Sequence, residues 1–128
     1  MRQTILIVDD DPQIRAMCTT TLEESGYSVR EASNGKKALA EIKKAACDLI
    51  VLDLSMPDVD GFEFLSAVRP KVPKLKVIVV SGFLGGTMLK AAKLLGAAAT
   101  LAKPFSADSL LLLVNEVLAT EGSVVGSD

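Results

Sequence analysis

The residue whose position most strongly suggests chemistry is Asp53, which directly follows an uninterrupted apolar run from Leu49 to Leu52. Such a run favours a strand that is buried on both faces, as in a parallel sheet. Pro57 and Gly61 follow shortly afterwards, and both are loop signals. We therefore expect Asp53 at the carboxyl end of a central strand, where open α/β sheets bind their ligands. A carboxylate in that position is costly unless it binds a cation or takes part in a reaction.

Further polar residues are expected at the same edge of the sheet, because each follows another apolar segment. Three clustered carboxylates repel one another unless a cation lies among them, and oxygen ligands suit Mg²⁺. A lysine and a serine hydroxyl can contact phosphoryl oxygens. Such a set could hold a phosphoryl group on Asp53. The other members are Asp9 and Asp10 after Thr4–Val8, Ser81 after Val77–Val80, and Lys103 after Ala98–Ala102.

The elements that must position these residues alternate along the chain. Five strands alternating with five helices predict an α/β sandwich around a parallel sheet. We expect one domain at residues 1–120 and a flexible C-terminal tail at 121–128. Besides the segments named above, the pattern predicts a short edge strand at 27–31 and a turn at Asn34–Gly35. Helices are expected from Pro12 to near Gly26, after that turn, at 62–69, at 87–96 and at 107–119, with Asp11, Thr87 and Ser106 as N-caps.

Composition narrows the function classes. The 128 residues carry a net charge of −2, which argues against nucleic acid as the main partner. No apolar run approaches the roughly 18 residues of a membrane span, and no signal peptide is evident, so we expect a cytoplasmic protein. The absence of histidine excludes Ser/His/Asp hydrolysis and a phosphohistidine carrier. Cys18 and Cys47 are interpreted as free, mostly buried thiols, and the basic group at 69–76 as a solvated loop.

Four sequence blocks together resemble the receiver domain of two-component response regulators. They are Val8-Asp-Asp10, Leu52-Asp53-Leu-Ser-Met-Pro57, Val80-Ser81-Gly82 and Lys103-Pro104-Phe105, and the resemblance extends over residues 3–119. It implies a flavodoxin-like, doubly wound, five-stranded parallel sheet of order 2-1-3-4-5, flanked by five helices. It also implies a phospho-accepting switch of a phosphorelay, which catalyses only its own phosphorylation and dephosphorylation.

The resemblance implies a role for each residue of the set. Asp53 would take a phosphoryl group from the phosphohistidine of a sensor histidine kinase or a histidine phosphotransfer protein. Asp10 and Asp53 would bind Mg²⁺ directly, Asp9 through water, and Ser55 through its backbone carbonyl. Ser81 would be the switch hydroxyl and Lys103 the phosphate-binding lysine, with a cis bond to Pro104. Thr100 replaces a common aromatic, so output is expected through the loop and helix after Ser81, while Ser55 and Phe83 occupy positions that tune access of water.

Two other functions stay open. One is an Mg²⁺-dependent phosphatase or phosphotransferase with an aspartyl nucleophile, but such enzymes need a further acid or base and usually a cap domain. The other is a scaffold that works without phosphorylation, against which the full set of acidic residues, Ser81 and Lys103 argues. The kinase, the output and whether the chain is part of a longer protein are not indicated by the sequence.

Four consecutive leucines, Leu110 to Leu113, indicate a partner surface. On a helix they sweep most of the circumference, whereas a helix on a sheet buries only a stripe. Leu111 or Leu112 must then point away from the core, unless the neighbouring helix covers it. We expect an exposed apolar patch on the last two helices and the fifth strand, for a homodimer or an output protein. The alternative is a tightly packed helix pair. The neighbouring helix would contribute Met88, Leu89, Leu94 and Leu95.

Overall fold

The computed structural model describes residues 2–54, 61–82, 92–94 and 96–126, with the side chains of 61, 62 and 120–126 outside that description. Its centre is a five-stranded sheet of order β2-β1-β3-β4-β5, in which every pairing is parallel. The expected strand order is confirmed. The strands are β1 (Thr4–Val8), β2 (Ser28–Ala32), β3 (Leu49–Asp53), β4 (Lys76–Ser81) and β5 (Ala99–Ala102).

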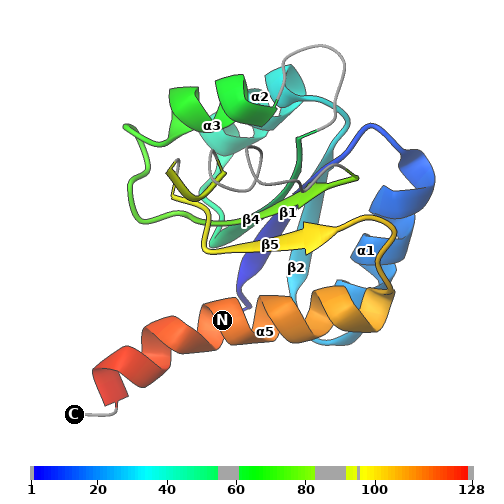
Figure 1. The fold of residues 1–128 in the computed structure, drawn as a ribbon, viewed down its shortest axis with the longest axis vertical. Helices are drawn as coiled ribbons and strands as arrows, with labels where there is room; N and C mark the ends of the chain where they lie inside the picture. The colour runs from blue at the N-terminus through cyan, green and yellow to red at the C-terminus, as the bar shows by residue number, and fades with distance from the viewer. Residues whose placement is uncertain (1, 55–60, 83–91, 95, 127–128) are drawn as a thin grey trace.

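Helices cover both faces of the sheet (Figure 1). α1 (Pro12–Glu24) and α5 (Ala107–Gly126) lie on one face, while α2 (Gly35–Lys44) and α3 (Gly61–Val68) lie on the other. Residues 92–94 are also helical, and the rest of the helix expected at 87–96, with its Thr87 cap, lies largely outside the described residues. The alternation of strands and helices in the sequence therefore produces a three-layer α/β domain.

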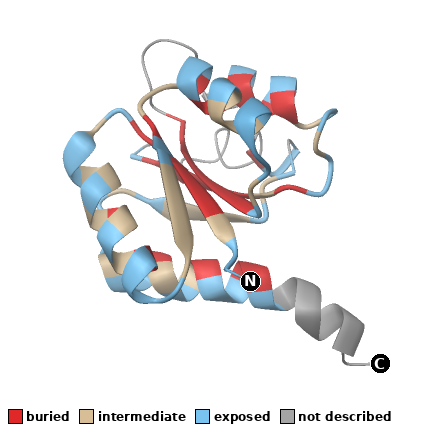
Figure 2. Ribbon diagram, turned by 180° about the vertical axis from the view of Figure 1, so that it is seen from behind, coloured by how far each residue is buried: buried red, intermediate tan, exposed pale blue. Residues whose placement is uncertain are grey.

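The strands divide their side chains between two cores, because successive residues of a strand point to opposite faces. Leu6, Ile50 and Val77 pack with Ala38, Phe64 and Leu65 beneath α2 and α3. Ile5, Leu49 and Ile78 pack with Cys18, Leu22 and Leu110 beneath α1 and α5. Figure 2 shows the result: buried residues concentrate in the central strands and on the inner sides of the helices. All five residues of β3 are buried, as its continuous apolar run predicts.

The first N–H groups of a helix have no carbonyl partner within the helix. Side chains at the N-cap positions accept hydrogen bonds from them. Asp11 Oδ1 accepts from Gln13 N at 2.9 Å, and Ser106 Oγ accepts from Ser109 N at 3.0 Å, as expected for N-caps. The prediction for Asn34–Gly35 was incomplete. Asn34 is the N-cap of α2, accepting from Lys37 N at 2.8 Å, and Gly35 is the first residue of the helix.

The last helix is longer than its sequence predicts. We expected α5 to end near Ala119 because the following residues are polar and include Gly and Ser. The helix instead continues to Gly126, and its final turns extend beyond the sheet in Figure 1. Adding one residue to an existing helix costs far less than starting a new one, so weak helix formers can extend a helix that is already docked. The domain limit at residue 120 stays a prediction.

Candidate functional site

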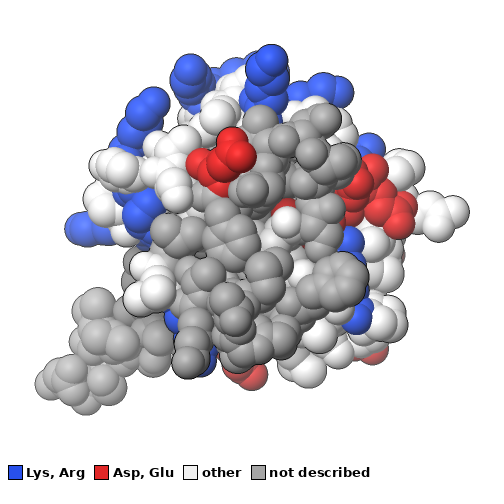
Figure 3. Space-filling model, turned by 45° about the horizontal axis from the view of Figure 1, so that its top comes forward, with Lys and Arg blue, Asp and Glu red and all other residues white. Residues whose placement is uncertain are grey.

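Three aspartates meet at the carboxyl edge of the sheet. Asp53 ends β3 and is 1% exposed, Asp9 follows β1 and is 3% exposed, and Asp10 is exposed to solvent. Each contributes one carboxylate oxygen to a group in which all atoms lie within 4.8 Å of one another. Figure 3 shows acidic side chains gathered on the side of the molecule where α1 begins. Oxygen-only donors at this spacing fit a hard cation such as Mg²⁺.

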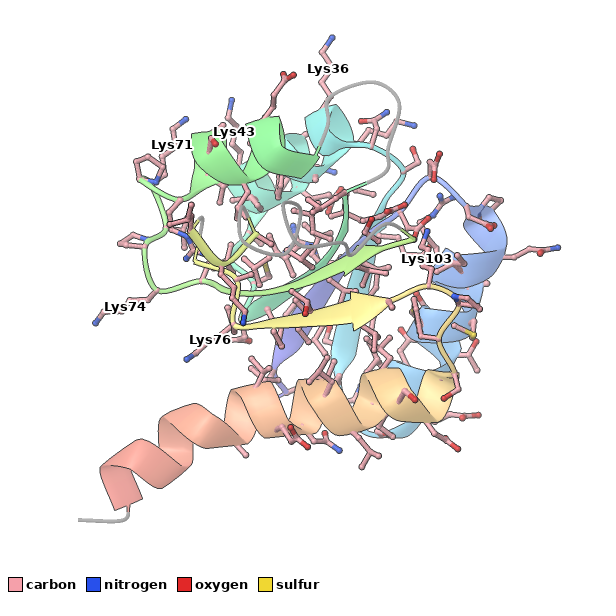
Figure 4. The ribbon with its side chains drawn as sticks, viewed as in Figure 1. Lys36, Lys43, Lys71, Lys74, Lys76 and Lys103 are labelled. Carbon is pink, nitrogen blue, oxygen red and sulfur yellow. The ribbon has the colours of Figure 1, made fainter. Side chains whose placement is uncertain are left out.

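Lys103 brings a positive charge into this acidic group from the end of β5. Its Nζ lies 3.0 Å from Asp53 Oδ2 and 3.1 Å from Asp9 Oδ2. Figure 4 places Lys103 beside the start of α1, apart from the other labelled lysines, which point outward. Its backbone N–H donates to the Ser81 carbonyl at 3.0 Å, which fixes the chain where it leaves the sheet. The Lys103–Pro104 bond is cis, as the sequence resemblance implied.

Ser81 is fully buried at the end of β4, the strand beside Asp53. Asp53 is paired with Val80 in the register of β3 and β4, so Ser81 lies one residue further toward the same edge. At Gly82, an added Cβ would meet no atom of the described residues within 4 Å. The structure therefore places Ser81 beside the acidic group.

The electrostatics of the site follow from burial and from the opposing charges. Burial raises the pKa of Asp9, and the negative charge of Asp53 raises it further, while the Asp11 N–H and Lys103 oppose the rise. Burial by itself would lower the pKa of Lys103, but its contacts with Asp53 and Asp9 outweigh burial and raise that pKa. Lys103 is therefore held as a cation, and Asp9 binds a proton more readily than a solvent-exposed aspartate does.

Two features beside the site were not predicted from the sequence. Arg15, in the first turns of α1, donates from Nη1 to the Asp9 carbonyl oxygen at 2.7 Å. A basic residue near a helix start carries no sequence signal for such a contact. The second feature is a largely apolar pocket of 310 Å³ next to the lysine, lined by Ile14, Met17, Lys103, Pro104 and Phe105.

Other candidate residues lie elsewhere or outside the description. Ser55 and Phe83 are outside the described residues, so neither the expected carbonyl ligand nor the expected effect on water can be placed. Thr100 is partly buried in β5, paired with Val79 of β4. In the basic group, Arg69 donates to the carbonyls of Pro73, Leu75 and Gly96, so its role is structural. Cys18 is buried and Cys47 partly buried, and both thiols are free, as expected.

The strand order and an acidic edge with a partly buried lysine define a flavodoxin-like α/β domain, a fold in which ligands bind at the carboxyl ends of the strands. The model of the response regulator receiver domain family matches residues 5–115. The chain belongs to this family, whose members act as phospho-accepting signalling switches in two-component systems and not as enzymes of metabolism.

Several known proteins are similar over nearly the whole chain. Sporulation initiation phosphotransferase F of Bacillus subtilis is 34% identical over 92% of this chain and 95% of its own length. Chemotaxis protein CheY of the same organism is also 34% identical, over 92% of this chain and 99% of its own. By contrast, this chain spans only 27% of the nitrogen assimilation regulatory protein NtrX of Azorhizobium caulinodans, at 37% identity.

Solved structures of receiver domain proteins are similar to this chain in fold as well as in sequence. The chemotaxis protein CheY4 of Vibrio cholerae superposes with a TM-score of 0.87 at 34% identity, covering 91% of this chain and 99% of that one. A CheY-like receiver domain protein from Methanospirillum hungatei gives a TM-score of 0.91 at 31% identity, covering 96% and 98%. Within the described part of this chain, no helix is long and apolar enough to cross a membrane.

Proposed function

We propose that Asp53 is the phospho-acceptor of this receiver domain and that it takes its phosphoryl group from a partner's phosphohistidine. The observation that carries the proposal is the environment of this carboxylate. It is almost fully buried at a strand end, yet it lies within 4.8 Å of two other carboxylates and 3.0 Å from Lys103 Nζ. The relatives named sporulation initiation phosphotransferase F and CheY support a signalling role. We also propose that the protein is cytoplasmic.

Asp9, Asp10 and Asp53 would hold Mg²⁺. In the structure both carboxylate oxygens of Asp9 have partners: Oδ1 accepts from the Asp11 N–H at 2.9 Å, and Oδ2 lies 3.1 Å from Lys103 Nζ. Each carboxylate oxygen of Asp9 thus already has a hydrogen-bonding partner, in keeping with a role through water. When bound, the ion would neutralise negative charge on the phosphoryl oxygens during transfer.

The transfer forms one bond and breaks one. A carboxylate oxygen of Asp53 forms a P–O bond with the phosphorus as the P–N bond breaks, and the imidazole nitrogen keeps the electron pair of that bond. Lys103 already lies against Asp53 and would move onto a phosphoryl oxygen, where a mobile ammonium stabilises the added charge. Water later hydrolyses the acyl phosphate, so the domain promotes its own gain and loss of phosphate.

Ser81 would report the phosphoryl group to the rest of the molecule. Its hydroxyl donates to a phosphoryl oxygen, and the loop and helix that follow shift with it. We further propose that the changed surface comprises the last two helices and β5 and binds an output protein or a second copy of this chain. In support, Leu112 is 64% exposed on α5 and Leu94 is exposed just before Gly96.

The test is phosphorylation by acetyl phosphate and Mg²⁺, followed by intact-mass measurement. Wild type should gain one phosphate, and Asp53→Asn should gain none because the amide is not a nucleophile. Asp48→Asn is a matched control, since Asp48 is an exposed carboxylate next to β3 whose Oδ2 accepts from Thr4 N at 2.7 Å. It should be phosphorylated as wild type is. One phosphate on Asp53→Asn would overturn the assignment.

A further inference from the structure

Arg15 joins the acidic site to the edge strand of the sheet. Its Nη1 donates to the Asp9 carbonyl oxygen at 2.7 Å, and its Nε donates to Glu31 Oε1 of β2 at 3.1 Å. The other Glu31 oxygen accepts from Thr19 Oγ1 at 2.8 Å, so the carboxylate that holds Arg15 is itself held. The Arg15 side chain is only 19% exposed. These contacts fix the guanidinium from two sides.

The Asp9 carbonyl matters because it belongs to the peptide group that leads into Asp10. The Asp9 N–H donates to the Ala32 carbonyl at 3.1 Å, and its carboxylate is held by Asp11 and Lys103. Arg15 supplies the donor for the one remaining hydrogen-bonding group of Asp9. Rotation of that peptide plane would turn the chain at Asp10 and separate its carboxylate from Asp53.

We propose that Arg15 is a positioning residue for the acidic site: it fixes the Asp9–Asp10 peptide so that both carboxylates converge on Asp53. The role rests on the proposed function, because it presumes that this group binds Mg²⁺. In this role Arg15 would touch neither the ion nor the phosphoryl group, because its hydrogen bonds are with Glu31 and the Asp9 carbonyl. Its charge is balanced by Glu31, so it orients the loop without opposing a cation nearby.

An arginine suits this role because its planar fork serves two acceptors at once. Nε is used by Glu31 and Nη1 by the Asp9 carbonyl, whereas a lysine offers a single nitrogen on a flexible stem. Partners that orient ligand residues commonly contribute about 10- to 100-fold to metal affinity. Arg15→Met should therefore weaken Mg²⁺ binding at least about tenfold, and Arg15→Lys should recover part of the loss.

The chain offers a matched control in Arg30 of β2. Its Nε lies 3.1 Å from Glu41 Oε1, its Nη1 donates to the Ala45 carbonyl at 3.0 Å, and its side chain is 22% exposed. Arg30 thus makes the same kinds of bond toward α2, away from the acidic site. Arg30→Met should lose stability much as Arg15→Met does, but keep wild-type Mg²⁺ affinity.

The experiment measures Mg²⁺ affinity by calorimetry for wild type, the two Arg15 variants and Arg30→Met, with an unfolding temperature for each. Amide NMR of the metal-free proteins should show shifted Asp10 and Asp11 signals in Arg15→Met only. Should Arg15→Met not fold, Glu31→Ala, which releases the guanidinium, should show a smaller loss in the same direction. Wild-type affinity in Arg15→Met or Glu31→Ala, or an equal loss in Arg30→Met, overturns the positioning role alone. A wild-type protein that binds no Mg²⁺ overturns the metal site and this role together.

Discussion

At the scale of single residues, Lys103 is the group whose contacts most directly constrain the chemistry. Its ammonium lies between Asp53 and Asp9, 3.0 and 3.1 Å from their oxygens. It therefore occupies part of the negative field that would attract a cation. A bound Mg²⁺ would compete with Lys103 for the same negative charge, and under the proposed function the two cations would act differently once Asp53 carries a phosphoryl group.

Replacing Lys103 with methionine should separate these roles. Removing one partner of a buried ion pair costs about 3–5 kcal/mol, and the partial exposure of Lys103 favours the lower end of that range. We expect Lys103→Met to lower the unfolding temperature without Mg²⁺, to leave Mg²⁺ affinity equal or tighter, and to impair the response to acetyl phosphate. Calorimetry and mass measurement would show this, with the exposed Lys74→Met as control. Loss of Mg²⁺ binding in Lys103→Met would contradict the division of roles.

The sequence indicates most of this site because four apolar strands end at or lead directly into a polar residue, and parallel strands end at the same edge of the sheet. Asp9, Asp53, Ser81 and Lys103 were all found in this way. Arg15 was not, since its partners are a backbone carbonyl and Glu31, which is sixteen positions away in the sequence. A side chain that binds a main-chain atom through the tertiary fold can do so whatever residue type supplies that atom. Such a contact therefore produces no recognisable pattern of residue types in the sequence.

At the scale of elements, α5 shows how one leucine run serves two environments. Leu110 is fully buried against the sheet, Leu111 and Leu113 pack partly against the same core, and Leu112 is 64% exposed. The prediction that Leu111 or Leu112 faces away from the core is therefore confirmed for Leu112. Met88, Leu89 and Leu95, the other members of the expected patch, lie outside the described residues.

Substitutions on α5 should separate folding from association. Leu110→Ala should cost about 2–5 kcal/mol of unfolding free energy through lost burial and a cavity. Leu112→Glu should change it by about 0.5 kcal/mol or less, because surface substitutions are usually tolerated. If the face binds a second copy of this chain, sedimentation of the phosphorylated protein should show association that Leu112→Glu weakens. Monomers in both proteins, together with unchanged capture of an output protein by Leu112→Glu, would rule out this face.

At the scale of the whole molecule, the predicted strand order rests on the family resemblance. The alternation of strands and helices predicts a parallel sheet, but it does not predict which strands are neighbours in that sheet. The limits of helices were the least certain. The pair Asn34–Gly35 predicts a turn because it is common in turns, yet the apolar face that follows makes it a helix start. Local composition cannot decide between these outcomes, because docking on the core decides them.

The buried thiol of Cys18 should make the fold sensitive to alkaline pH. Burial raises the pKa of Cys18 from 9.0 to about 12, so the thiol stabilises the native state fully below pH 9. That contribution is lost as the pH rises from 9 toward 12, at about 1.4 kcal/mol per pH unit. Cys18→Ala should show a shallower fall of unfolding temperature with pH. Cys47→Ala, whose thiol pKa is raised to about 11, is the control with a narrower window.

Equal slopes in wild type and Cys18→Ala would show that ionisation of this thiol does not limit alkaline stability. Tyr27 and Lys103 also have raised pKa values, so some alkaline loss should persist in both cysteine variants.

The positions of the strands have a consequence for local opening. Asp9, Asp10 and Asp53 follow or end β1 and β3, which are paired on both sides, whereas Lys103 follows β5, which pairs only with β4 among the described strands. Edge segments open with lower free energy than central ones. We therefore expect hydrogen exchange near the lysine to be faster than near the aspartates. Local opening of this edge would move Lys103 away from the phosphoryl group that we propose it neutralises, while Asp9, Asp10 and Asp53 stay together. The lifetime of the proposed acyl phosphate would then depend partly on how often one short strand opens.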